Sequence, residues 1–394
     1  MRVAYITHYA DLYGANRSLL ELIGELQRRG DVEPHVLLPQ QGPLVGELER
    51  MSVPYRIIPF ETRMVHRDFM GGPHHRLMQR WRYARDARGR RNRNRELLPA
   101  IIDQVKAWRV QLIHANSSAV SIAPDVSSEA SIPLIWHIRE LLALHYGIHP
   151  DSGRSEYGRS LRDADRLIGI SEAVREDVAR YTALVRPLVV VYNGVVPKAR
   201  YAELRSMADE RWSTPGSFTF AMVGLIHPSK GHLEALDALR LVLDAGADVR
   251  LIIAGDGRMD VLHERITALG LAAHVELPGF VENAFDVYNR SHAVLMCSRH
   301  EAMGRVTVEA MASGLAVIGH ASGGTLELLR DPAVGILYNG GAEELARHML
   351  GLVGDPVRAR RLGEHASLQA ESRFSVERCA DEVWRVYQEV RSTR

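Results

Sequence analysis

Apolar runs of four to seven residues alternate with helix-length amphipathic stretches from one end of this 394-residue chain to the other. Such alternation favours parallel sheets that are covered by helices on both faces. The predicted fold class is therefore α/β, with two doubly wound, Rossmann-like domains. We predict strands at Val3–Thr7, His35–Leu38, Tyr55–Ile58, Gln111–Ala115, Leu134–His137, Arg166–Ile170, Leu188–Tyr192, Phe218–Val223, Val249–Ala254, His274–Leu277, Ala293–Met296, Ala316–Gly319 and Gly335–Tyr338. The helices between them include Asn16–Arg29, Ser171–Tyr181, Lys230–Ala245 and Ala342–Leu352.

The two blocks of strands and helices divide near Pro197. A chain of this length holds about two domains, at roughly 150 residues per domain. We predict one domain at 1–197 and a second at 198–375, with the polar stretch 198–217 as their connection. The last of three closing helices, in 376–394, can pack back on the first domain. Ligands of doubly wound sheets bind beyond the carboxyl ends of the strands, so we expect both sheets to face a central cleft.

A pair of glutamates, Glu301 and Glu309, is the most informative local feature of the chain. Glu301 follows the predicted strand Ala293–Met296, and Glu309 is expected about two turns into the next helix. The amino end of a helix has free N–H groups and partial positive charge, which suit a phosphate. Two acids so placed can hold different ends of one polar ligand. Taken alone, the spacing is more typical of two solvated glutamates on an amphipathic helix.

Three further candidate residues lie where predicted strands end. Lys230 opens a helix, where its charge adds to N–H groups that attract phosphate; a solvated surface lysine is the alternative. Gly14 lies between the first strand and helix, where backbone without a side chain can approach a ligand closely. A turn that needs glycine explains Gly14 equally well. His137 ends a strand, a position that points into a cleft more often than into the core, although a lone histidine slightly favours a structural role.

Two binding classes are disfavoured by spacing. The sequence Gly255-Asp-Gly257 lacks the third glycine of a dinucleotide fingerprint and does not follow the first strand, which argues against a nicotinamide enzyme. Asp163 and Asp165 suggest a metal-binding pair, but Asp165 directly precedes a predicted strand. No other cluster of acids or histidines has metal-ligand spacing, so we predict no metal site.

Composition indicates the cellular setting. The chain is 46% apolar and 25% charged, as in ordinary globular proteins. No apolar run approaches the roughly 20 residues of a membrane span. The first residues enter a strand at once and leave no room for a signal peptide. The two cysteines provide no disulfide framework. We therefore expect a cytoplasmic protein.

One segment, residues 76–95, is strongly basic, with nine arginines and a single acid, Asp86. Such a concentration of charge suggests an anionic partner. Docking on anionic lipid is one prediction, with Trp81 and Leu77 supplying apolar contact. It would place the protein peripherally on the inner face of the cell membrane. A solvated, partly disordered loop before a helix that starts near Asn94 is the other. No nucleic-acid recognition motif accompanies the charge, so we predict no nucleic-acid partner.

Taken together, the motifs resemble those of retaining glycosyltransferases of family 4, which have the two-domain GT-B fold. The match runs through nearly the whole chain and is strongest from Val223 to Leu329. The motifs that carry it are Val223-Gly224, Lys230-Gly231, Gly255-Asp-Gly257, Ser298-Arg-His-Glu301, Gly304, Glu309-Ala-Met-Ala-Ser-Gly314 and Gly323-Gly-Thr-Leu-Glu327, with Gly14, His137, Ile170-Ser-Glu-Ala173 and Asn193-Gly194-Val195 in the first half.

The resemblance implies a transfer of sugar from a nucleotide-diphosphate-sugar donor to a glycan, lipid-linked or small-molecule acceptor, as in polysaccharide biosynthesis. It implies no cofactor and no metal, with the donor bound by the second domain and the acceptor by the first. The site residues that it implies are Glu309 for the ribose, Glu301 with backbone near Met303 and Gly304 for the donor sugar, Lys230 and Gly14 for the pyrophosphate, His137 beside the reacting sugar, and backbone around Phe280 and Val281 for the base.

One departure from the family pattern concerns the cations. The family usually has arginine directly after Gly224, and this chain has Leu225. A departing pyrophosphate needs stabilising cations or donors, and Arg305 is the nearest candidate replacement. The family mechanism implied is front-face attack, with Glu301 in positioning rather than nucleophilic attack. Two other functions remain open, a catalytically silent nucleotide-sugar-binding or scaffold protein and a GT-B sugar-nucleotide epimerase.

Overall fold

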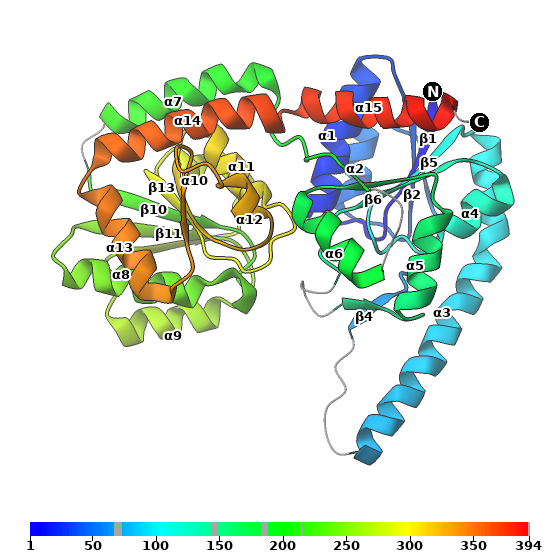
Figure 1. Cartoon of the computed structure of the whole chain (residues 1–394), viewed down its shortest axis with the longest axis horizontal. Helices are drawn as coiled ribbons and strands as arrows, with labels where there is room; N and C mark the ends of the chain where they lie inside the picture. The colour runs from blue at the N-terminus through cyan, green and yellow to red at the C-terminus, as the bar shows by residue number, and fades with distance from the viewer. Residues whose placement is uncertain (67–72, 143–147, 183–187, 214–215, 393–394) are drawn as a thin grey trace. The chain divides into compact units, whose positions relative to one another are not determined.

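The computed structural model describes residues 1–66, 73–142, 148–182, 188–213 and 216–392. The chain divides into two compact units (Figure 1). Unit 1 comprises Met1–Gly194 together with Val376–Arg394, and unit 2 comprises Val195–Ser375. Each unit has its own parallel sheet. The predicted α/β class with two doubly wound domains is confirmed.

Unit 1 contains a seven-stranded parallel sheet in the order β3-β2-β1-β5-β6-β8-β9. Its strands are β1 (Arg2–Ile6), β2 (Glu33–Leu38), β3 (Tyr55–Ile57), β5 (Leu112–Ala115), β6 (Leu134–Ile138), β8 (Arg166–Gly169) and β9 (Val189–Val190). Its helices are α1 (Gly14–Arg28), α2 (Pro43–Arg50), α3 (Pro73–Ala107), α4 (Ala123–Ala130), α5 (Arg154–Asp163), α6 (Glu172–Thr182) and α15 (Val376–Ser392). The short strands β4 (Met64–His66) and β7 (Ile148–Pro150) pair with each other antiparallel.

Unit 2 contains a six-stranded parallel sheet in the order β12-β11-β10-β13-β14-β15. Its strands are β10 (Phe218–Val223), β11 (Val249–Ala254), β12 (Val275–Gly279), β13 (Ala293–Met296), β14 (Ala316–His320) and β15 (Ile336–Tyr338). Its helices are α7 (Tyr201–Ser213), α8 (His232–Asp244), α9 (Met259–Leu269), α10 (Phe285–Tyr288), α11 (Arg305–Ala312), α12 (Gly323–Leu328), α13 (Gly341–Val353) and α14 (Pro356–Phe374), with 3₁₀ turns at Lys198–Arg200 and Pro228–Lys230. In Figure 1, α8, α9 and α13 lie on one face of this sheet and α7, α11 and α14 on the other.

Every predicted strand is present, because a strand buried on both faces is apolar at consecutive positions and stands out in the sequence. In β13, all four residues are buried. The strands β4 and β7 were not predicted. They have only three residues each and pair outside the main sheet, so no apolar run marks them.

The last helix, α15, belongs to unit 1 although 181 residues of unit 2 precede it. Its buried side chains, such as Val383 and Tyr387, lie in the same apolar cluster as Leu19 and Ile23 of α1. This packing buries one stripe of an amphipathic helix against the strands' helical cover. As a result, the chain's end contributes side chains to the interior of unit 1.

Two predictions about polar segments are wrong. The stretch 198–217, expected as a connection, is largely the helix α7 of unit 2; residues 214–215 of it lie outside the described part. The arginine-rich segment is neither a loop nor the approach to a helix at Asn94, because α3 runs continuously from Pro73 to Ala107. Its arginines are good helix formers. Hydrophobic periodicity is too weak in either segment to reveal a helix.

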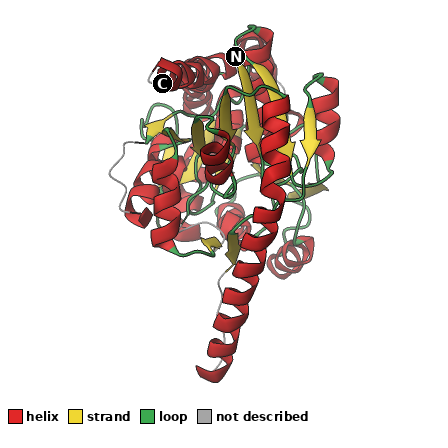
Figure 2. Cartoon of the chain, turned by 90° about the vertical axis from the view of Figure 1, so that its right-hand side faces the viewer, coloured by secondary structure: helices red, strands yellow, loops and turns green. Residues whose placement is uncertain are grey.

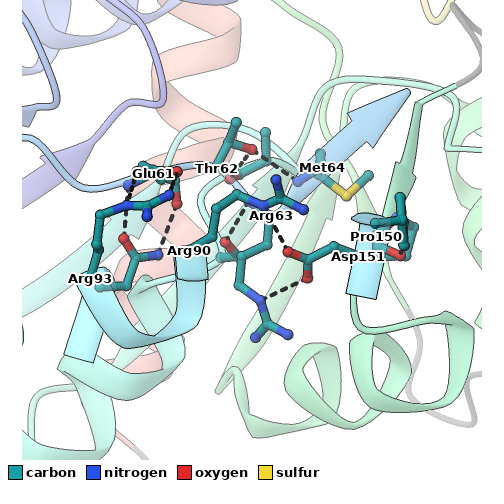
Figure 3. A network of polar contacts seen from close by, with 12 residues as sticks. Glu61, Thr62, Arg63, Met64, Arg90, Arg93, Pro150 and Asp151 are labelled. Carbon is teal, nitrogen blue, oxygen red and sulfur yellow. Dashed lines mark hydrogen bonds and ion pairs between the residues drawn. The ribbon is translucent and has the colours of Figure 1, made fainter. Parts of the chain in front are cut away.

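The carboxyl half of α3 is anchored to the rest of unit 1 by a polar network (Figure 3). Asp151, whose side chain is fully buried, accepts from Arg63 Nε and Arg90 Nε at 3.0 Å each. Arg93 forms an ion pair with Glu61, and the Asn94 side chain exchanges two 2.8 Å hydrogen bonds with the Glu61 backbone. The amino-terminal half of α3 extends away from the other elements of unit 1 (Figure 2).

We expect Asp151→Ala to lower the free energy of unfolding by about 3 kcal/mol or more, because it leaves two arginines without their buried partner. Asp86→Ala is the matched control, since Asp86 is half-exposed and pairs with exposed Arg85; we expect about 1 kcal/mol or less. Urea denaturation followed by circular dichroism measures both. Equal losses for the two variants would contradict this role of Asp151.

Candidate functional site

The topological switch point of unit 2 lies between β10 and β13, where the strand order reverses direction. Parallel strands end at the same edge of a sheet, and ligands of such sheets bind beyond that edge at the switch point. The loop after β10 carries Lys230, and the loop after β13 carries Glu301. The topology therefore brings these two residues to the ligand-binding edge of the unit.

Lys230 and Glu301 form an ion pair. Their side chains are only 19% and 13% exposed, so each neutralises a charge that is partly removed from water. The two loops are also joined by backbone, because the Arg299 N–H donates to the Ser229 carbonyl at 3.2 Å. Lys230 lies in a 3₁₀ turn two residues before α8. The predicted lysine and the first predicted acid therefore belong to one cluster.

The loop from Glu301 to Gly304 is fixed by the start of α12. The Glu301 carbonyl accepts from Gly324 N–H at 2.7 Å. A Cβ atom at Gly324 would lie 2.5 Å from the Met303 Cα, so only glycine permits this approach. His300 adopts a φ of 64°, a left-handed conformation that costs a non-glycine residue about 1–3 kcal/mol. Strain of this kind concentrates at ligand-binding loops.

Helix α11 carries the second acid. Gly304, with a φ of 94°, precedes it, and Arg305 is its first residue. Glu309 is the fifth residue, one turn from the helix start rather than the two turns expected. Arg305 Nη2 lies 3.6 Å from Glu309 Oε1, and the Tyr288 hydroxyl donates to Glu309 Oε2 at 3.3 Å. Burial raises the pKa of Tyr288 well above its ordinary value, and the nearby Glu309 charge adds to the rise.

The remaining unit 2 candidates lie around the same edge. Met303 is buried beneath the loop. Phe280 and Val281 directly follow β12, and the Phe280 side chain is 65% exposed. An exposed aromatic ring beside a strand end leaves its backbone accessible to a ligand.

In unit 1, Gly14 is exposed at the first position of α1. The loop before it is held by the buried Asn16, whose side-chain N–H groups donate to the Tyr9 and Asp11 carbonyls at 3.0 and 2.9 Å. This loop follows β1, and β1 and β5 flank the switch point of this sheet. Gly14 therefore lies at the ligand-binding edge of unit 1.

His137 is not at an open strand end as expected. It is completely buried within β6, because Ile138 continues the strand and the ring packs against that of His114. Its Nδ1 lies 3.2 Å from His114 Nε2 and 3.4 Å from Arg139 Nη2. Burial lowers the pKa of both histidines well below its ordinary value, and the Arg139 charge lowers it further. Both rings are therefore neutral.

No group of three or more histidines, cysteines or acids within the described residues could hold a metal ion. Asp163 ends α5, and Asp165 Oδ2 accepts from the Leu134 N–H at 2.8 Å, so it joins two strands. In the same described ranges, no helix combines the length and apolar character needed to cross a membrane.

Two family models match the chain. The glycosyl transferases group 1 model covers residues 209–369, and the glycosyltransferase family 4 model covers residues 13–198. The two matches fall one on each unit. The chain belongs to the family 4/group 1 glycosyltransferases of the GT-B fold.

Individual relatives of this glycosyltransferase are distant. An uncharacterized glycosyltransferase of Methanocaldococcus jannaschii is 26% identical over 296 residues, covering 73% of this chain and 77% of that protein. A D-inositol 3-phosphate glycosyltransferase of Nocardia farcinica is 28% identical over 276 residues, covering 67% of this chain but only 58% of that protein. The structure of Anabaena HepE in complex with UDP superimposes with a TM-score of 0.77 at 21% identity, over 99% of this chain and all of that one.

Sequence reasoning missed several polar residues of this glycosyltransferase that surround His137. Arg139 is buried and donates from Nε to Asn116 Oδ1 at 2.8 Å and from Nη1 to Asn193 Oδ1 at 2.6 Å. The Arg139 side chain directly follows a buried strand, which is the available signal. His114 lies inside the apolar run of β5, where a polar residue at a core position marks a special role.

Proposed function

We propose that the protein transfers a sugar from a nucleotide-diphosphate sugar to a glycan, lipid-linked or small-molecule acceptor, with retention of anomeric configuration and without a metal. The observation that carries the proposal is the pairing of Lys230 with Glu301 and of Arg305 with Glu309 around the amino end of α11. Structures of HepE that are described as complexes with UDP and with UDP-glucose share the fold. Their bound ligands support a diphosphate donor here.

The donor's diphosphate would meet Lys230 and the free N–H groups of α11 beyond Gly304. Its negative charge competes with Glu301 for the lysine ammonium, so binding would release the Glu301 carboxylate toward the sugar hydroxyls. Glu309 accepts hydrogen bonds from the ribose, and Tyr288 holds that carboxylate from behind. In this scheme, the acids act through position and charge rather than as nucleophiles.

In the proposed reaction, the bond from the anomeric carbon to the diphosphate oxygen breaks while the acceptor oxygen bonds to the same face of that carbon. The acceptor's proton passes to the departing diphosphate oxygen. Negative charge accumulates on the diphosphate as it leaves, so cations preorganised around it lower the barrier. Lys230 and Arg305 are the cations that we assign to this role.

A thermal-shift panel of UDP-, GDP-, ADP- and TDP-sugars tests the proposal on the full chain. One donor at 100 times its dissociation constant stabilises the fold by about 2.7 kcal/mol, which a shift in Tm reports. That donor should then be hydrolysed slowly without acceptor, and EDTA should not reduce the rate. Binding without any hydrolysis or transfer would indicate a silent binding protein and overturn the proposed activity.

We expect Arg305→Ala to lower kcat at least as strongly as Lys230→Ala, because Leu225 leaves no arginine at the family's usual position. Loss of one such donor costs roughly 10²–10³ in kcat. Arg299→Ala is the control, since its exposed side chain lies 3.5 Å from Glu234 rather than in the acid pair. Wild-type turnover by Arg305→Ala at saturating donor would contradict the assignment.

We further propose that α3 docks on an anionic membrane surface, where a lipid-linked acceptor is met. Leu77, Met78 and Trp81 are 66%, 52% and 67% exposed on its extended half, among arginines. The Arg85 guanidinium lies 5.6 Å from the centre of the Trp81 ring. Apolar side chains interspersed with cations suit the boundary between lipid headgroups and acyl chains.

Arg80→Ser with Arg82→Ser should weaken binding to phosphatidylserine-containing vesicles by about thirtyfold, at about 1 kcal/mol for each basic residue. Co-sedimentation measures the partition. Arg358→Ser with Arg361→Ser removes two exposed arginines from α14 and is the matched control, expected to bind as wild type. Equal binding to neutral phosphatidylcholine vesicles, or equal weakening by both pairs, would contradict this docking surface.

A further inference from the structure

A chain of hydrogen bonds connects His137 to the last helix of the protein. Tyr387 of α15 places its hydroxyl 2.7 Å from His114 Nδ1, and His114 Nε2 lies 3.2 Å from His137 Nδ1. All three side chains are completely buried. Within the described residues, His137 Nε2 has no hydrogen-bond partner. A buried polar atom left unpaired costs about 1–3 kcal/mol, so this atom needs an explanation.

The chain can run in either of two directions. A neutral imidazole has one N–H donor and one acceptor nitrogen. If His137 Nδ1 accepts, then His114 Nε2 donates, His114 Nδ1 accepts from Tyr387, and His137 Nε2 carries the hydrogen. If His137 Nδ1 donates, every bond reverses and His137 Nε2 becomes a bare acceptor.

Arg139 decides the direction. A guanidinium has only donors, and Arg139 Nη2 lies 3.4 Å from His137 Nδ1. The bonds of Arg139 to Asn116 and Asn193 fix the guanidinium in that orientation. A hydrogen on His137 Nδ1 would face the positive charge, whereas a lone pair there is stabilised by it.

The Tyr387 hydroxyl is consistent with this direction. It has one hydrogen, and its oxygen is 2.7 Å from His114 Nδ1 but 3.3 Å from the Tyr5 hydroxyl oxygen. The shorter contact receives the hydrogen more favourably. His114 Nδ1 is then an acceptor, as Arg139 requires.

We infer that Arg139, His114 and Tyr387 hold His137 in the tautomer with hydrogen on Nε2, so that His137 donates a hydrogen bond to an oxygen of the bound ligand. Resting on the proposed function, that oxygen is a hydroxyl of the donor sugar. His137 then acts as a hydrogen-bond donor, not as a proton acceptor. Arg139, His114 and Tyr387 are positioning residues, and α15 becomes part of the site's support.

Nitrogen-15 NMR of the full chain labelled at histidine tests the tautomer without substrate. The ring signals lost in His137→Gln identify His137. We expect a protonated-type shift for Nε2 and an unprotonated-type shift for Nδ1. An unprotonated Nε2, or a ring protonated at both nitrogens near neutral pH, would overturn the inference.

Two tyrosine variants read the direction of the chain. Tyr387→Phe removes the donor to His114, so the His137 shifts should move toward a mixture of tautomers and kcat should fall about tenfold, the effect of losing one well-placed hydrogen bond. Tyr5→Phe is the control and should leave the tautomer unchanged. If Tyr5→Phe mixes the tautomers as strongly, the chain runs the other way.

The ligand contact is tested separately from glycosyl transfer. We expect His137→Gln to raise KM for the sugar donor more than the dissociation constant for the free nucleoside diphosphate, which has no sugar. If the tautomer is as inferred but both constants stay at wild-type values, the ligand contact is overturned while the enzyme activity stands.

Discussion

The ion pair between Lys230 and Glu301 is the interaction around which the rest of unit 2 is arranged. It exists because β10 and β13 are neighbours at a switch point, so the loops that follow them meet at one edge of the sheet. Neutralising the two charges allows both side chains to be mostly buried without a ligand. The same pairing keeps a cation and an acid ready to separate when a more negative group arrives. Ligand-free stability and ligand binding therefore depend on one contact.

Unit 1 uses a different electrostatic arrangement. Its ligand-binding edge is supported by a buried cation, Arg139, held by amide oxygens and facing two neutral histidines. A charge so placed in a low-dielectric interior orients the polar groups around it. The carboxyl-terminal helix supplies one of those groups, although it comes from the far end of the chain. The return of α15 to unit 1 is thus part of the site's construction as well as of the core.

The sequence predicted the strands well, because fully buried parallel strands are runs of apolar residues that need no partner to be recognised. It also predicted that Lys230, Glu301, Arg305 and Glu309 belong together, since their spacing follows strand ends. It failed for α3 and α7, whose helices are polar on most faces and gain stability from ion pairs rather than an apolar stripe. It also misplaced His137, because burial depends on Ile138 and His114, which only the folded sheet brings alongside.

The central claim is that a donor's diphosphate takes Lys230 from Glu301 at the amino end of α11. A crystal structure of the full chain with its best-binding nucleotide sugar tests this most directly. The account predicts Lys230 Nζ about 3 Å from a diphosphate oxygen, Glu301 turned toward the sugar, and Glu309 at the ribose. A diphosphate bound away from α11, with the Lys230–Glu301 pair intact, would contradict it.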